Sequence, residues 1–245
     1  MDFTFNLLGM NIWVVLVIVL SSLLKGLTGF GFALVSLPVL MAWYPPREII
    51  PVLMICNLIA SLFIVLQKKQ HPLVTRPYQS LIVSGGLFTV LGVMALKTVS
   101  EQTLVHITGL AFIVLTLFSW RKLPKVKLPP IAFSLAGALI GFITGAISVS
   151  GPPLALFLNL SRVDNRGFRE IFAWFSIVTA VVAIAGYIQT GLLTMQSLKM
   201  ALVFVPILLL GTIVGKRLNT LFSVNAFRKI NMAITLLASF LLLVS

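Results

Sequence analysis

Charged residues are scarce in this chain, and acidic residues are the scarcest. Of its 245 residues only 9% are charged, whereas 59% are hydrophobic. An average soluble domain has about 25% charged residues. A soluble fold of this size could not bury so much apolar surface, so we expect the solvent to be lipid for most of the chain.

Two further shortages exclude whole classes of function. Cys56 is the only cysteine, so no intrachain disulfide can form. The five acidic residues all fall in expected loops or at the ends of expected helices: Asp2, Glu48, Glu101, Asp164 and Glu170. No carboxylate is therefore expected at mid-membrane. This disfavours a proton relay or a cation site and excludes a two-aspartate intramembrane protease. We expect no cofactor and no metal ion.

The net charge of +13 does not indicate a nucleic-acid-binding protein. The basic residues lie in short loops between apolar segments, which is how Lys and Arg are distributed on the cytoplasmic side of membrane proteins. We therefore expect the chain to meet a lipid bilayer and not nucleic acid.

Ten apolar runs divide the chain. They are long and do not alternate, and an open sheet edge cannot exist in lipid, so strands are not expected. The sequence predicts an all-α, polytopic membrane protein. The runs cover residues 8–24, 30–43, 49–66, 78–96, 102–120, 129–147, 152–161, 170–189, 196–215 and 225–244.

Two runs are too short to cross a bilayer alone. As helices, 30–43 and 152–161 would be about 21 and 15 Å long, against a hydrocarbon core of about 30 Å. If each short run and its predecessor form one crossing, the basic residues divide almost equally between the two sides. If they form two passes or a re-entrant hairpin, only Arg47, Lys97 and Lys199 of the 18 basic residues lie on one side. The positive-inside rule favours the second arrangement, which places both termini outside the cytoplasm.

The two halves of the chain resemble each other. Three pairs of segments match in the same order: 26–38 with 141–153, 47–49 with 169–171, and 92–97 with 211–216. This order indicates a duplication. Five elements per half is an odd number, so the second repeat would be inverted, as in many transporters. We expect a first transmembrane repeat at 1–120, a basic cytoplasmic linker at 121–130 and a second repeat at 131–245.

The breaks before the two short helices are the candidate site. Ser150 is suited to the N-cap of the second short helix and Pro152 to its first turn, while Thr28 or Gly29 could cap the first. Each short helix would then begin with unpaired N–H groups and a positive dipole end. Inversion would bring these two N-termini together near the midplane, which predicts a site for a small anion.

Alternatives remain open for several of these residues. Lys25 could attract the anion or extend to the cytoplasmic face, and Asn57 could line the site or bond a neighbouring helix. The glycines could serve only close helix packing, with the hydroxyls bonded to backbone carbonyls. The predicted substrate-binding residues are Lys25, Thr28, Gly29, Phe30, Gly31, Asn57, Ser148, Ser150 and Gly151.

The chain resembles the TauE/SafE family of sulfite exporters, also known as toluene-sulfonate uptake permeases. The resemblance covers the whole chain and rests on glycine patterns: Gly26-x-x-Gly29-x-Gly31 with Pro38, and Gly141-x-x-x-Gly145 through Gly151-Pro152-Pro153. The second break is serine-rich here, where family members often have consecutive glycines. The resemblance implies transport of small organic or sulfur-containing anions, such as sulfite, sulfoacetate or other sulfonates.

The expected protein is a multi-pass transporter of a bacterial inner (plasma) membrane. An inside-negative potential favours anion export by about 2.3 kcal/mol per charge per 100 mV, so export is the preferred direction. An anion channel of the same fold is an alternative, and a homodimer is compatible with the sequence. A serine hydrolase using Ser148-Val149-Ser150-Gly151 is disfavoured, because no histidine follows Ser150 and His71 and His106 come much earlier.

Overall fold

The computed structural model is helical throughout the residues that it describes. These are residues 12–28, 32–66, 76–120, 126, 128–161, 163, 165–218, 233, 235–241 and 243. The helices are α1 (Ile12–Thr28), α2 (Phe32–Leu40), α3 (Pro46–Leu66), α4 (Arg76–Thr98), α5 (Glu101–Trp120), α6 (Pro130–Ile147), α7 (Gly151–Leu160), α8 (Asn165–Thr190) and α9 (Met195–Leu218). Residues 235–241 are also helical. The predicted all-α class is confirmed, with every predicted run matched by a helix.

Five of these helices are long and apolar enough to cross a membrane. The spans are Pro46–Phe63, Arg76–Thr98, Pro130–Ile147, Glu170–Thr190 and Met195–Leu218. Large apolar side chains cover their outer faces, and Leu91, Leu135, Ile188 and Leu202 are all exposed. Such a surface is stable only against lipid. The chain is therefore a multi-pass membrane protein.

A glycine-lined seam joins α4 to α6. A Cβ on Gly141 would overlap the backbone of Gly85, and one on Gly145 would overlap the carbonyl of Thr89. Thr89 also donates a hydrogen bond across the seam to the Gly141 carbonyl, at 3.1 Å. Small residues allow two helices in lipid to approach until their backbones touch, and dispersion forces then hold them together. Residue numbers rise together along the seam, so the two helices are parallel.

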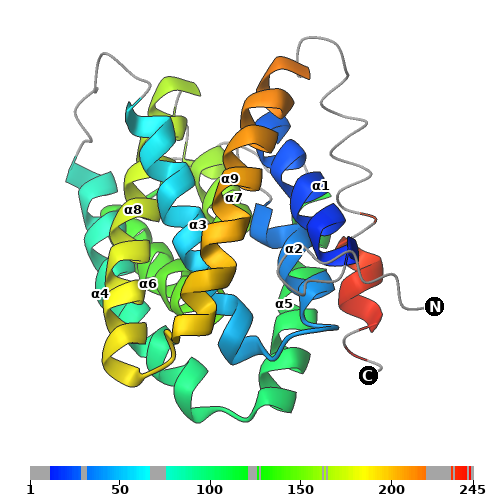
Figure 1. The fold of residues 1–245 in the computed structure, drawn as a ribbon. Coiled ribbons are helices and arrows are strands. Elements are labelled where there is room, and N and C mark those ends of the chain that lie inside the picture. The colour runs from blue at the N-terminus through cyan, green and yellow to red at the C-terminus, as the bar shows by residue number, and fades with distance from the viewer. Residues whose placement is uncertain are drawn as a thin grey trace.

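A second seam of the same kind joins α1 to α9. A Cβ on Gly26 would overlap the Thr212 carbonyl, and one on Gly215 would overlap the Leu23 carbonyl. These two helices are parallel as well. Figure 1 shows α4, α6 and α8 on the left of the molecule and α1 and α2 on the right, with α3 and α9 between them. In the predicted repeat, α1 is equivalent to α6 and α4 is equivalent to α9. A seam between α4 and α6 therefore predicts an equivalent seam between α9 and α1. The repeat stays a prediction, which this packing supports.

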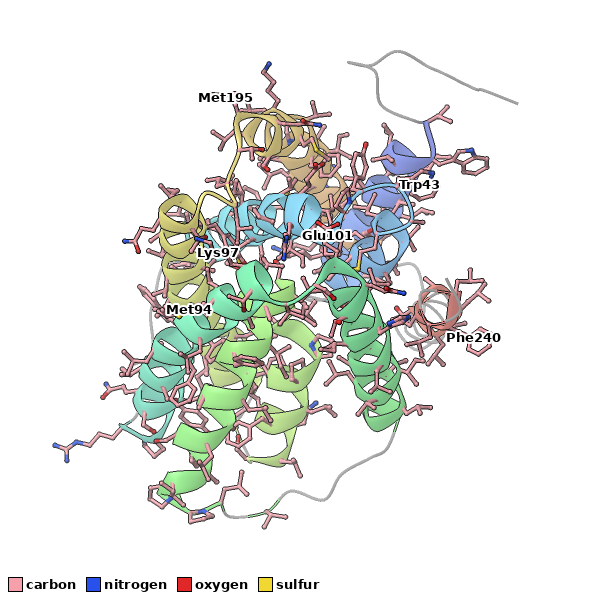
Figure 2. All side chains as sticks on the ribbon, turned by 90° about the horizontal axis from the view of Figure 1, so that it is seen from below. Trp43, Met94, Lys97, Glu101, Met195 and Phe240 are labelled. Atoms are coloured by element: carbon pink, nitrogen blue, oxygen red, sulfur yellow. The ribbon has the colours of Figure 1, made fainter. Side chains whose placement is uncertain are left out.

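Arg47 ties the start of α3 to the end of α4. Its guanidinium donates hydrogen bonds to the carbonyls of Leu96 at 3.3 Å, Lys97 at 3.0 Å and Val99 at 2.8 Å. Carbonyls at a helix C-terminus have no partner within their own helix, and a cation there also meets the negative end of the dipole. Figure 2, the view from below, shows Lys97 and Glu101 at this end of the molecule.

The described basic residues divide between the two ends. Arg47 and Lys97 lie at the end just described, and Arg76 lies at the other end of α4. Helix α8 runs parallel to α4, since Gly85 meets Phe175 and Gly186 meets Val93. The short turn 191–194 therefore starts α9 near Lys97, and α9 ends near the level of Arg76. The basic end of α9, which holds Lys216 and Arg217, is thus opposite the Arg47 end.

Candidate functional site

The break between α6 and α7 has an unusual backbone. Ser148 follows the last turn of α6 in the left-handed conformation, with φ 56° and ψ 26°, and its N–H donates to the Thr144 carbonyl at 2.8 Å. Among the residues that the structure describes, it alone has positive φ without being glycine. This conformation turns the chain sharply, and α7 begins only three residues later. The sequence pattern around the break therefore ends one helix and starts another.

The start of α7 presents unused hydrogen-bond donors. Ser150 is the N-cap and Pro152 lies in the first turn, as expected, but the Ser150 hydroxyl makes no capping hydrogen bond. The N–H groups of Ser150 and Gly151 meet no carbonyl of the described residues. A helix N-terminus of this kind has partial positive charge and favours an anion.

The two short helices begin at the same cavity. Its volume is about 30 Å³, whereas one water molecule needs about 10–15 Å³ by the same measure. It therefore suits a compact ligand. The lining residues come from α1, α2, α3, α7, α8 and the α6–α7 break: Lys25, Phe32, Ala33, Leu34, Asn57, Ser148, Val149, Ser150, Gly151, Pro152 and Phe172. The first residues of α2 and of α7 thus line the same space.

Lys25 lies inside the protein at this cavity. It is only 5% exposed, so it does not extend to the molecular surface. Its ammonium donates a hydrogen bond to the Asn57 Oδ1 at 3.3 Å and lies 6.0 Å from the centroid of the Phe32 ring. The Asn57 side chain lines the cavity and also accepts this hydrogen bond from a neighbouring helix.

Neutral groups otherwise surround this cation. No acidic residue and no histidine occurs among the described residues that line the cavity. The hydroxyl of Ser148 makes a long contact of 3.8 Å with the Met54 sulfur. The serines of the break therefore have no carboxylate or imidazole beside them among the described lining residues.

Five of the nine predicted site residues line the cavity. They are Lys25, Asn57, Ser148, Ser150 and Gly151. The side chain of Thr28 and the whole of residues 29–31 lie outside what the structure describes. Sequence reasoning missed the apolar part of the lining. Ala33 and Leu34 directly follow the predicted break and could have been included, but nothing local to Phe172 points to the site.

Further hydrogen bonds hold the α6 side of the cavity in place. The buried Tyr187 hydroxyl donates to the Gly145 carbonyl at 2.6 Å. Thr144 donates to the Ile140 carbonyl at 2.6 Å. All residues from 144 to 150 are buried. The break is therefore held by packing and by these hydrogen bonds at the end of α6, directly before the residues that line the cavity.

Glu170 departs from the sequence expectation. We expected it at a helix end, but α8 begins at Asn165, because the helix extends before its apolar run. Glu170 is 5% exposed, and neither of its carboxylate oxygens has a hydrogen-bond partner among the described residues. It is not among the residues that line the cavity. Glu170 thus lies in the second turn of α8, although it is the first residue of the membrane-crossing span Glu170–Thr190.

Comparison with known proteins gives one match. The model of the family described as sulfite exporter TauE/SafE matches residues 14–242, which is nearly the whole chain. No curated protein and no solved structure matches. The matched region includes both glycine seams and every described residue that lines the cavity. The match assigns no role to any of these residues. The chain therefore belongs to the sulfite exporter TauE/SafE family of membrane transporters.

Proposed function

We propose that the protein transports small organic or sulfur-containing anions, such as sulfite, sulfoacetate or other sulfonates, and binds them in the cavity between α2 and α7. One observation is the main support. Lys25 is buried at the cavity with a neutral hydrogen-bond partner, and no described lining residue is acidic. A buried charge without a counter-charge costs several kcal/mol. A bound anion would supply that counter-charge.

The donors around the cavity suit an oxyanion. The N–H groups of Ser150 and Gly151, the Ser150 hydroxyl and the Asn57 amide would supply neutral hydrogen bonds. Helix N-termini bind anions in this way in many proteins. Thr28 and residues 29–31 belong to the same proposal, because they immediately precede α2 in the chain.

The proposal extends to direction and orientation. An inside-negative membrane potential favours anion export by about 2.3 kcal/mol per charge per 100 mV. We place the protein in the inner (plasma) membrane of a bacterium, with both termini extracytoplasmic. A C-terminal reporter enzyme that works only outside the cytoplasm should be active. An inactive reporter, together with an active cytoplasmic one, would reverse this orientation.

The decisive test replaces the buried cation. Lys25→Met keeps the length of the side chain and removes its charge, and Lys199→Met is the matched control at an exposed position on α9. Purified wild-type protein should be stabilised against heat by sulfite or methanesulfonate more than by chloride. The expected gain is about 2.7 kcal/mol at a ligand concentration of 100 times Kd.

Lys25→Met should lose this stabilisation, whereas Lys199→Met should keep it. If Lys25→Met folds and is still stabilised as the wild type is, the anion binds elsewhere. If the wild type responds to none of these anions more than to chloride, the proposed substrate class is wrong. Saturation of efflux from loaded proteoliposomes would distinguish a carrier from a channel, because channel flux continues to rise with concentration.

A further inference from the structure

The partner of the buried lysine is an amide where a carboxylate is usual. Buried lysines in proteins are almost always paired with an acidic group. Here the Lys25 ammonium donates a hydrogen bond to the Asn57 Oδ1 at 3.3 Å, and the centroid of the Phe32 ring lies 6.0 Å from it. An amide oxygen and an aromatic face both attract a cation without cancelling its charge.

We propose that Asn57 determines the charge specificity of the cavity, because it positions the Lys25 ammonium without neutralising it. Asparagine and aspartate have nearly the same shape, and either could accept the hydrogen bond from Lys25. Only aspartate would bring a negative charge to the cavity. The neutral amide therefore keeps one positive charge available to a ligand, and its NH₂ group remains a donor when its oxygen accepts from Lys25.

Because the site is buried, the difference between asparagine and aspartate at position 57 should have a large effect on anion binding. Lys25 is 5% exposed and Asn57 is partly buried, so water screens charges less here than at the molecular surface. Two unit charges about 4 Å apart interact by several kcal/mol under such conditions. A carboxylate at position 57 would pair with Lys25 and repel the anion. The inference rests on the proposed function, since it concerns the same cavity.

The test is the single-atom replacement Asn57→Asp. We expect the affinity for sulfite and for methanesulfonate to fall by about 100-fold or more, measured by heat stabilisation and by isothermal titration of the purified protein. A purely structural role predicts the opposite, because aspartate would hold Lys25 at least as tightly. The Tm of Asn57→Asp without ligand should therefore equal or exceed that of the wild type.

Two further variants complete the comparison. Asn159→Asp makes the same chemical change at an exposed position of α7 and should keep wild-type affinity. Asn57→Ser keeps a neutral acceptor and should weaken binding by only about fivefold, the effect of a poorer hydrogen bond. If Asn57→Asp does not fold, Asn57→Ser still tests whether a neutral acceptor at this position keeps most of the anion affinity.

Each outcome bears on a different claim. Wild-type affinity in Asn57→Asp, or equal losses in Asn57→Asp and Asn57→Ser, would overturn the role of Asn57. In either case, tight binding by the wild type would leave the proposed function standing. Absence of binding by the wild type would instead overturn the proposed function.

Discussion

The two short helices differ in the chemistry that surrounds their first turns. The start of α2 lies near a cation, since Lys25 and Asn57 both come from the first half of the chain. The start of α7 lies near the hydroxyls of Ser148 and Ser150 and the N–H groups of Ser150 and Gly151. The first half therefore supplies a charge and an amide, and the second half supplies hydroxyl and backbone donors. The proposed anion site would use both kinds of group.

The predicted alignment of the two halves shows that equivalent positions carry different groups at the cavity. When Gly26 is matched with Gly141, Lys25 corresponds to Ile140 and Ser150 corresponds to Val35. The glycines of the two seams have similar surroundings, but the residues at the cavity do not. If the halves descend from one ancestor, the scaffold has stayed alike while the chemistry has diverged.

The largest effect should come from breaking the shared scaffold. Gly26→Ala and Gly141→Ala each place a Cβ where a neighbouring backbone already lies. Overpacking of this kind costs about 3 kcal/mol when the obstacle is backbone. We expect both variants to lose stability to a similar extent in thermal unfolding of the purified protein. Gly86→Ala is the control, because its Cβ would meet only side-chain atoms, of Val178 at 3.1 Å and of Val182 at 3.9 Å. A tolerated Gly26→Ala beside an unfolded Gly141→Ala would show that the two seams are not equivalent.

A second comparison concerns the two glutamates of the matched Arg-Glu-Ile segments. Glu170 is buried without a hydrogen-bond partner among the described residues, whereas Glu48 is only partly buried. A buried polar group without a partner costs about 1–3 kcal/mol, and more when it is charged. Glu170→Gln should therefore raise the unfolding temperature, and Glu48→Gln should leave it nearly unchanged. Destabilisation by Glu170→Gln would mean that the carboxylate has a favourable partner.

Removing a hydroxyl from the second break should have a smaller effect than removing the charge of Lys25. The Ser150 hydroxyl makes no capping hydrogen bond, so Ser150→Ala should leave stability unchanged. We expect anion affinity to fall about fivefold, the effect of one neutral hydrogen bond. Thr28→Val removes the corresponding hydroxyl candidate from the first break and should act similarly. Unchanged affinity in both variants would place the neutral donors elsewhere.

The smallest effect is expected at Ser148, where backbone and side-chain roles can be separated. Its left-handed conformation is costly for serine and not for glycine. Ser148→Gly should therefore stabilise the protein by about 1 kcal/mol, whereas Ser148→Ala should not. Both variants remove the same hydroxyl, so any loss of anion binding that they share reports on that hydroxyl. Equal stability of the two variants would contradict the backbone argument.

The helices and their number follow from the sequence alone. Lipid offers no hydrogen bonds to an exposed backbone, so each long apolar run had to become a helix. Glycine, serine and proline at residues 144–153 marked the α6–α7 break for equally local reasons. For this reason the sequence could place Ser148, Ser150 and Gly151 at the break, and all three line the cavity. Helix ends were less certain, and the early start of α8 at Asn165 left the burial of Glu170 unforeseen.

Tertiary structure decided which residues line the cavity. Whether Lys25 points inward depends on α3, which places Asn57 within 3.3 Å of its ammonium. Phe172 reaches the cavity from α8, more than a hundred residues away in sequence from α1. No local sequence pattern predicts that two such distant segments line one cavity. The sequence thus predicted two breaks, and separate helices lie on the two sides of each, α1 and α2 at the first and α6 and α7 at the second. The packing of α3 and α8 against those breaks determined that a charge would be enclosed there.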